Sequence, residues 1–264
     1  MIGQNKIKNL IETSSLDNFP NSLILLGEKG SGKHTICDLI SDKLNLQIID
    51  ISEKLTQEMI DEIYTRVEPY IYIISDEKLT IKNQNSILKF LEEPLKNSYI
   101  ILLVEHRNKL LPTILNRCQI WELEKYSTNE LSQFIITKVD SRILDIAKTP
   151  GDVILMQDEN NKFADLYELI DKLIEKIPIA SFSNILSITN RINFDGKESD
   201  KFDLTVFLRT LVWLSSTKVL NSDNIYYQEV YKLVNELSNN MSILNINKKT
   251  CFENFLVKMK VLRC

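Results

Sequence analysis

SLILLGEKGSGKHTICDLISDKL, residues 22–44, decides the fold of this chain. An apolar run at 22–26 leads into the glycine-rich loop 27–33, and a helix-forming segment follows at 35–44. A strand, a glycine-rich loop and a helix in this order form a phosphate-binding loop, in which backbone N–H groups and a lysine hold phosphate oxygens. The stretch therefore predicts a nucleotide-phosphate site between a buried strand and a helix.

The loop departs from its usual pattern at one position. The motif has a Ser or Thr directly after its lysine, whose hydroxyl reaches Mg²⁺, but this chain has His34 there and a hydroxyl only at Thr35. The residues expected to contact nucleotide are Gly27, Gly30, Ser31, Gly32, Lys33, His34 and Thr35. We expect a weak site for ATP or ADP with Mg²⁺, and a vestigial loop that packs well and binds nothing is the alternative.

The spacing of apolar residues divides the rest of the chain into two regions. Further short apolar runs lie at 47–51, 70–74, 98–104 and 119–123, separated by helix-length segments. This alternation predicts a parallel five-stranded sheet with helices on both faces. From residue 127 onward the apolar period is helical. We therefore expect an α/β fold followed by an all-α region, with a core at 1–123, a small helical lid at 124–163 and a helical domain at 164–264.

Composition excludes several classes of protein. The net charge of −4 argues against a protein that coats nucleic acid through bulk charge. The four cysteines, at positions 37, 118, 251 and 264, are scattered, and only two histidines accompany them, so we expect no structural zinc or other metal site. No stretch resembles a signal peptide or a membrane span, which predicts a cytoplasmic protein without a membrane partner.

Two later segments carry a family resemblance. Residues 78–94 read KLTIKNQNSILKFLEEP, and residues 109–119 read KLLPTILNRCQ. In this order the two blocks resemble the AAA+ subunits of the DNA polymerase clamp loader, and most of all the delta-prime subunit of DNA polymerase III. Residues 2–4 resemble the family's opening segment near the adenine, and 252–262 resemble the last helix of its oligomerisation collar. The resemblance implies an AAA+ core, a lid and a C-terminal collar.

The same resemblance implies a weakened hydrolytic site. Gapless alignment from Leu79 and Thr80 puts Ile74 and Ser75 where the family has its Walker B acids. Val104 and Glu105 fall at the polar sensor of the fourth strand. Asp152 follows Pro150-Gly151 where a sensor arginine is usual, and an acid there would repel a γ-phosphate. We expect little or no intrinsic ATPase activity. A different strand end that moves Asp76 and Glu77 toward the metal is one alternative reading, and a polar turn is the other.

Arg117 is the predicted functional residue. In the family the arginine that corresponds to Arg117, in the triplet at 116–118, reaches into the ATP site of the neighbouring subunit. The alternative is an ordinary surface arginine in a salt bridge. The resemblance implies a stator in a ring of clamp-loader AAA+ subunits, which acts through that assembly on a sliding clamp and primer-template DNA. The alternatives are a working clamp-loader ATPase that uses Lys33, Thr35 and Asp76 or Glu77, and another AAA+ adaptor such as a helicase loader.

Overall fold

The fold is taken from a computed structural model. It describes residues 2–52, 60, 63–66, 68–94, 98–136, 139–158, 162–177, 181, 183, 187, 189–190, 192–193, 202–241 and 246–262. Two compact units, Met1–Glu130 and Leu131–Cys264, make up the chain.

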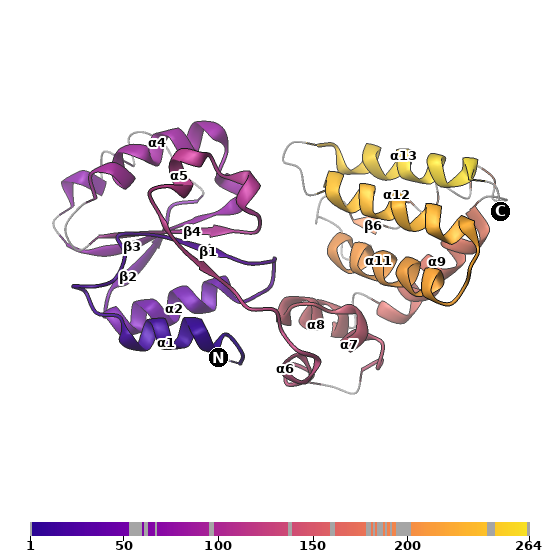
Figure 1. The fold of residues 1–264 in the computed structure, drawn as a ribbon, viewed down its shortest axis with the longest axis horizontal. Helices are drawn as coiled ribbons and strands as arrows, with labels where there is room; N and C mark the ends of the chain where they lie inside the picture. Colours follow the sequence, from indigo (N-terminus) through magenta and orange to yellow (C-terminus); the bar gives the residue numbers. More distant parts are fainter. Residues whose placement is uncertain are drawn as a thin grey trace. The chain divides into compact units, whose positions relative to one another are not determined.

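The first unit is built on a parallel sheet of five strands (Figure 1). The strands are β1 (Ser22–Leu26), β2 (Gln47–Asp50), β3 (Tyr70–Ser75), β4 (Tyr99–Val104) and β5 (Gln119–Glu122). Their order is β2-β3-β4-β1-β5, and every pair is parallel. The predicted sheet is confirmed, with strand ends within one residue of those expected.

Helices cover both faces of this sheet. α1 (Asn5–Thr13) and α2 (Lys33–Leu44) lie on one face, and α4 (Ile81–Glu92) and α5 (Pro112–Leu115) lie on the other (Figure 1). Alternate residues of β3 serve the two faces: Ile71 and Ile73 join the apolar core with α2, whereas Tyr72 and Ile74 join the core with α4. Two 3₁₀ turns, η1 (Asp76–Lys78) and η2 (Arg107–Lys109), follow the strands β3 and β4.

Helix α4 begins and ends as the sequence predicts. The Thr80 hydroxyl accepts a hydrogen bond from the Asn83 backbone N–H at 3.3 Å, which caps the first turn. The helix ends at Glu92, two residues before Pro94, because a proline cannot continue the hydrogen-bond ladder. Gln84 therefore lies in the first turn of the helix, and Glu92 is its last residue.

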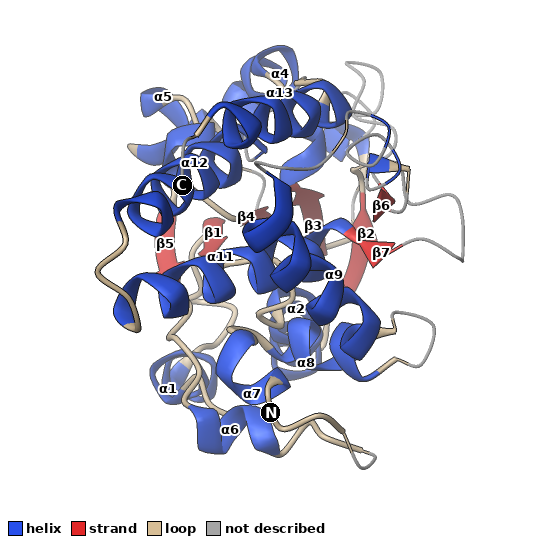
Figure 2. Cartoon of the chain, turned by 90° about the vertical axis from the view of Figure 1, so that its right-hand side faces the viewer, coloured by secondary structure: helices blue, strands red, loops and turns tan. Residues whose placement is uncertain are grey.

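The second unit is almost entirely helical (Figure 2). Its described helices are α6 (Thr128–Ser132, which crosses the unit boundary), α7 (Ile143–Ile146), α8 (Pro150–Gln157), α9 (Phe163–Lys176), α11 (Leu204–Leu220), α12 (Ile225–Met241) and α13 (Lys248–Val261). α11 packs against α9 and α12, and α12 packs against α13. The α/β region followed by an α region is confirmed.

One short element of the second unit was not predicted. β6 (Ile192–Asn193) and β7 (Phe202–Asp203) form a two-residue parallel pair beside α11. Two residues are too few for a period to show in sequence, and only the buried Ile192 and Phe202 mark the pair. Residues 194–201, between the two strands, lie outside the described part of the chain.

α7 and α8, which fall in the predicted lid, pack against α11 of the predicted helical domain. The boundary between residues 163 and 164 stays a prediction. Across the described ranges, no helix has the length and apolar character needed to cross a membrane.

Candidate nucleotide-phosphate site

The glycine-rich loop after β1 has a shape that requires its glycines. Gly30 and Gly32 have φ angles of 77° and 92°, in the left-handed region that side chains disfavour. A Cβ on Gly27 would lie 2.9 Å from Ser31 Oγ and 3.0 Å from Leu123 Cβ. The loop therefore turns tightly and leads directly into α2, whose first N–H groups and macrodipole favour an anion.

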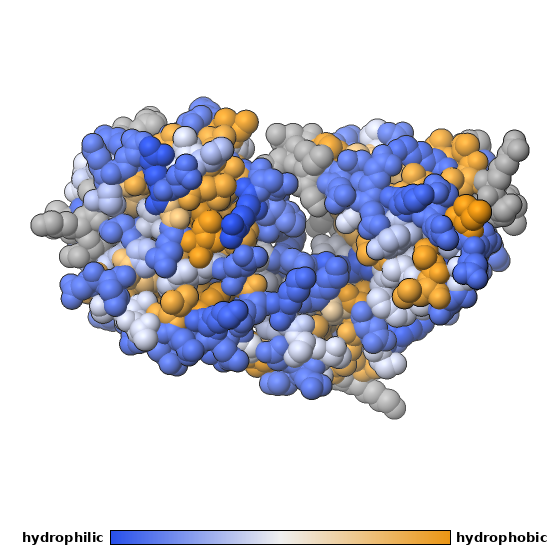
Figure 3. Space-filling model, in the orientation of Figure 1, coloured by the Kyte–Doolittle hydropathy of each residue, from blue (hydrophilic) through white to orange (hydrophobic). Residues whose placement is uncertain are grey.

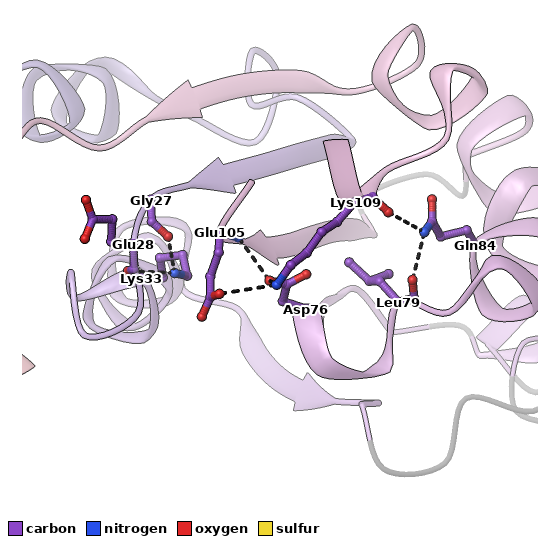
Figure 4. Close-up of polar contacts among 8 residues, drawn as sticks. All are labelled: Gly27, Glu28, Lys33, Asp76, Leu79, Gln84, Glu105 and Lys109. Atoms are coloured by element: carbon purple, nitrogen blue, oxygen red, sulfur yellow. Dashed lines mark hydrogen bonds and ion pairs between the residues drawn. The ribbon is translucent and has the colours of Figure 1, made fainter. Parts of the chain in front are cut away.

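Lys33 is folded onto its own loop. Its ammonium donates to the backbone oxygens of Gly27 and Glu28, the latter at 3.0 Å (Figure 4). Burial lowers the pKa of Lys33, and the nearby carboxylates of Glu105 and Asp76 partly oppose this shift. The lysine therefore lies at the loop beside two acids, and phosphate oxygens could exchange with the carbonyls that it now contacts.

The predicted contact residues divide into two groups. Gly27 and residues 30–33 come together in one loop, with Ser31 buried. His34 and Thr35 lie exposed on the first turn of α2. Their contact with a nucleotide stays a prediction.

Tyr126 closes one side of the loop, and sequence reasoning missed it. Its hydroxyl donates to the Ser31 backbone oxygen at 2.9 Å, and a Cβ on Gly3 would lie 3.1 Å from its ring. Gln4 is 2% exposed, and its side-chain amide exchanges two 2.7 Å hydrogen bonds with the Glu124 backbone. The opening segment 2–4 is thereby fixed beside Tyr126 and the phosphate loop.

The end of β3 presents a different residue from the one that gapless alignment selects. Ile74 is buried in the apolar core, and the Ser75 N–H donates to Ser52 Oγ at 2.8 Å. Asp76, one residue further, is 6% exposed and lies in the site, whereas Glu77 is exposed. The strand ends at Ser75, and the turn η1 directs the Asp76 carboxylate inward. Asp76, not Ser75, brings an acid to this strand end.

Asp76 is already paired with an internal cation. Its Oδ2 accepts from Lys109 Nζ at 2.6 Å and from the Glu105 N–H at 3.2 Å, and Lys109 also donates to Glu105 Oε2 at 3.2 Å (Figure 4). Burial lowers the pKa of Lys109, but the hydrogen bonds and charges of Asp76 and Glu105 outweigh it, so the net shift is upward.

Magnesium does not fit this donor set. Both carboxylates at the strand ends share the Lys109 ammonium, and His34 offers no hydroxyl. A bound Mg²⁺ would have to displace that ammonium from Asp76. Within the described part of the chain, no three His, Cys, Asp or Glu side chains are grouped to hold a metal. Burial raises the pKa of the Cys37 and Cys118 thiols to about 12, so both are poor metal ligands at neutral pH.

Gln84 holds the turn that carries Lys109. It is 1% exposed, donates to the backbone oxygens of Leu79 and Lys109 at 2.8 and 2.9 Å, and accepts from the Leu111 N–H at 2.7 Å. These bonds join α4 to the turns on either side of it. Because all three partners are backbone groups, Gln84 fixes the course of the chain from the site toward α5.

Arg117 lies at the surface just beyond α5. Its guanidinium contacts Glu92 Oε1 at 2.8 Å and donates to the Thr113 backbone oxygen at 2.9 Å. The side chains of Arg117 and Glu92 are 35% and 51% exposed. The two family blocks therefore meet here, since Glu92 lies near the end of the first block and Arg117 lies in the second.

The Asp152 carboxylate is not the free acid that the sequence analysis assumes. It is 2% exposed at the start of α8 and accepts from the backbone N–H groups of Lys148 and Thr149 at 2.9 and 3.0 Å, in a capping box with Thr149. Arg209 lies 3.4 Å from its Oδ2. The carboxylate is thus neutralised within its own unit, and the expected repulsion of a γ-phosphate does not follow from this residue.

Comparisons with known proteins agree with the family blocks. Residues 38–127 match the family described as DNA polymerase III, delta subunit. The chain is 24% identical to the DNA polymerase III subunit delta' of Bacillus subtilis over 215 residues, which is 78% of this chain and 64% of that protein. It is 36% identical to the subunit delta' of Haemophilus influenzae over 77 residues, or 29% and 22% of the two chains.

The predicted resemblance to DNA polymerase III clamp-loader subunits is confirmed. The aligned regions span less than two thirds of these relatives' lengths. A DNA polymerase III, gamma subunit-related protein from Thermotoga maritima has the same fold, with a TM-score of 0.55 at 15% identity over 97% of this chain and 99% of that one. This likeness supports the predicted fold, a parallel α/β sheet followed by a helical region.

Proposed function

We propose that this chain is a delta-prime-like stator of a replicative clamp loader, which supports ATP-dependent loading of a sliding clamp onto primed DNA. In this role it hydrolyses little or no ATP itself. It supplies Arg117 in trans to the ATP site of a neighbouring subunit. The single observation that carries the proposal is the placement of Arg117 at the surface, where the two family blocks meet.

The contacts of Arg117 suit a residue that changes partner. Its ion pair is with Glu92, whose side chain is 51% exposed. Exposed ion pairs of this kind contribute about 0–1 kcal/mol, so exchanging Glu92 for a phosphate costs little. α4 and α5 meanwhile hold the backbone on both sides of the pair. A guanidinium of this type accelerates nucleotide hydrolysis by about 10³ to 10⁵ where it reaches the transition state.

The chain's own site supports the absence of turnover. Phosphoryl transfer needs a metal ion and a group that positions water. Here Asp76 and Glu105 are paired with Lys109, and His34 replaces the metal-binding hydroxyl. The loop 27–33 and Lys33 remain able to hold the phosphates of ATP or ADP.

The partners in this proposal are the other AAA+ subunits of a clamp loader, joined through the collar at 164–264. Figure 3 shows apolar residues at the surface of the second unit. Leu220 and Ile225, at the turn between α11 and α12, are 84% and 71% exposed, and Val261 on α13 is 75% exposed. Such side chains suit burial in an assembly. The clamp and primer-template DNA would be contacted through that assembly, in the cytoplasm.

A second candidate function is a clamp-loader ATPase. The observation that favours it is the buried Asp76 beside Lys33 at the end of β3. Turnover by the purified chain that Lys33→Ala abolishes would establish this candidate in place of the stator. A helicase-loading adaptor would instead fail to co-purify with clamp-loader chains.

The experiment for the stator is reconstitution with the other clamp-loader chains of the same organism. Arg117→Ala is expected to lower the ATPase rate of the assembly by about 10²-fold or more. Arg107→Ala is the matched control, because Arg107 is also a surface arginine of this unit in an exposed ion pair, 3.3 Å from Glu122. If Arg117→Ala and Arg107→Ala give the same rate, the finger assignment is wrong.

A further inference from the structure

Four charged side chains meet at the carboxyl ends of three neighbouring strands. The loop with Lys33 follows β1, Asp76 follows β3, and Glu105 follows β4. The register pairs Leu26 with Val104 and Ser75 with Leu103, so these ends lie at one edge of the sheet. Figure 4 shows Glu105 between the Lys33 amine and the Asp76–Lys109 pair.

The cluster is electrically balanced without a metal ion. Two ammonium groups, of Lys33 and Lys109, face two carboxylates, of Asp76 and Glu105. The side chains of Lys109 and Asp76 are only 15% and 8% exposed, which weakens solvent screening of their charges. A divalent cation would make two positive charges redundant and would compete with Lys109 for the same oxygens.

We propose that Lys109 takes the place of a divalent metal ion, so that the phosphate loop holds a nucleoside diphosphate without one. This inference rests on the proposed nucleotide binding by the loop and specifies its mode. The chemical class of the ligand is a nucleoside polyphosphate, free of magnesium.

The hydrogen-bond capacity of Lys109 permits this role. An ammonium has three N–H donors. Asp76 Oδ2 and Glu105 Oε2 take two of them, and no third partner is present among the described residues. The third donor is available for a phosphate oxygen.

The acids act as positioning residues for this cation. Asp76 Oδ1 is buried and has no hydrogen-bond partner in the described part of the chain. The carboxylate therefore has spare acceptor capacity, and it retains the ammonium at the strand ends while one N–H turns toward a phosphate. Gln84 holds the Lys109 backbone through its 2.9 Å hydrogen bond to the Lys109 oxygen.

The test is ADP binding to the full chain, measured by calorimetry in EDTA and in Mg²⁺. The wild-type chain is expected to bind ADP in EDTA within about 3-fold of its affinity in Mg²⁺. Lys109→Met is expected to bind about 10-fold or more weakly in EDTA, because a charge-assisted hydrogen bond is lost. Lys109→Arg should bind within about 3-fold of wild type, since it keeps the charge. Lys82→Met, at an exposed lysine on α4, is the matched control and should have no effect.

Asp76→Asn separates the proposal from a metal-binding role of this acid. If Asp76 holds a metal ion, Asp76→Asn weakens ADP binding in Mg²⁺ and leaves binding in EDTA unchanged. Under the proposal, the variant changes ADP binding by the same factor in EDTA and in Mg²⁺, because Asp76 acts only by positioning Lys109. Should Lys109→Met fail to fold, the double variant Asp76→Asn/Lys109→Met removes one charge of each sign and is expected to show the same loss in EDTA.

Several results would overturn the inference. A wild-type affinity that falls about 10-fold or more in EDTA contradicts it, and so does equal binding by wild type and Lys109→Met. Failure of the wild type to bind ADP in both buffers contradicts it as well. None of these results bears on the stator role, which is measured separately through Arg117 in the assembly.

Discussion

Lys109 Nζ lies 2.6 Å from Asp76 Oδ2, although the two residues are 33 positions apart in the chain. The contact joins the turn after β3 to the turn after β4 at the edge of the sheet that carries the phosphate loop. It neutralises the acid that this edge offers to a metal ion. It also makes the folded state depend on a buried charge pair.

Lys109→Met is expected to destabilise the chain by about 3–5 kcal/mol, because it leaves Asp76 buried without its counter-ion. Asp76→Asn/Lys109→Met should recover most of that loss. Urea unfolding of wild type, both single variants and the double variant gives the coupling energy. Additive effects of the two single substitutions would show that the pair contributes nothing.

The same pair predicts a response to alkaline pH. The pKa of Lys109 is raised in the folded chain, so its contribution to stability is fully present below the unfolded value, about 10.4. That contribution is lost as the pH rises through the folded pKa. Lys109→Arg should match wild type at pH 7 and exceed it in thermal stability once the pH rises above the folded pKa of Lys109, because arginine stays charged. Parallel melting curves for the two proteins across this range would disprove the effect.

Gln84→Leu is expected to cost about 2–4 kcal/mol of stability. The substitution leaves the backbone oxygens of Leu79 and Lys109 and the Leu111 N–H without their partner, and each buried orphan group costs about 1–3 kcal/mol. Asn85→Leu, at the exposed next position on α4, should change stability by about 0.5 kcal/mol or less. Chemical denaturation of both variants measures the difference. Similar values for the two would mean that Gln84 is not a structural clamp.

Asp152→Arg restores the residue type that the family usually has at this position, yet we expect it to destabilise the chain by at least about 2 kcal/mol. The substitution removes the capping box with Thr149 and places an arginine against Arg209 in a buried site. No gain of ATPase activity is expected. Thr149→Ser keeps the cap and serves as the control. A stable Asp152→Arg chain that hydrolyses ATP would reverse this interpretation.

Much of the fold could be predicted from sequence because its signals are local. Each strand is a short apolar run bounded by polar residues, and Thr80 and Pro94 mark the ends of α4 within a few positions. The signal for the phosphate loop is also local, since its three glycines and Lys33 all lie within residues 27–33.

The charged cluster could not be predicted in the same way. Whether Ser75 or Asp76 faces the site depends on where β3 ends, and a shift of one residue changes the side chain that is presented. The partner of Asp76 comes from a turn on the far side of two further elements. The predicted repulsion of a γ-phosphate by Asp152 fails for a related reason. Arg209 and two backbone N–H groups neutralise its carboxylate, and the local sequence does not reveal these partners.

The claim that this chain works in a neighbour's site is tested most directly by comparing two variants in the reconstituted, DNA-stimulated clamp loader. We predict that Arg117→Ala lowers the ATPase rate of the assembly by about 10²-fold or more, while Lys33→Ala leaves it within about 2-fold of wild type. The reverse pattern, a large loss with Lys33→Ala and a normal rate with Arg117→Ala, would show that the chain is a working ATPase with no finger in trans.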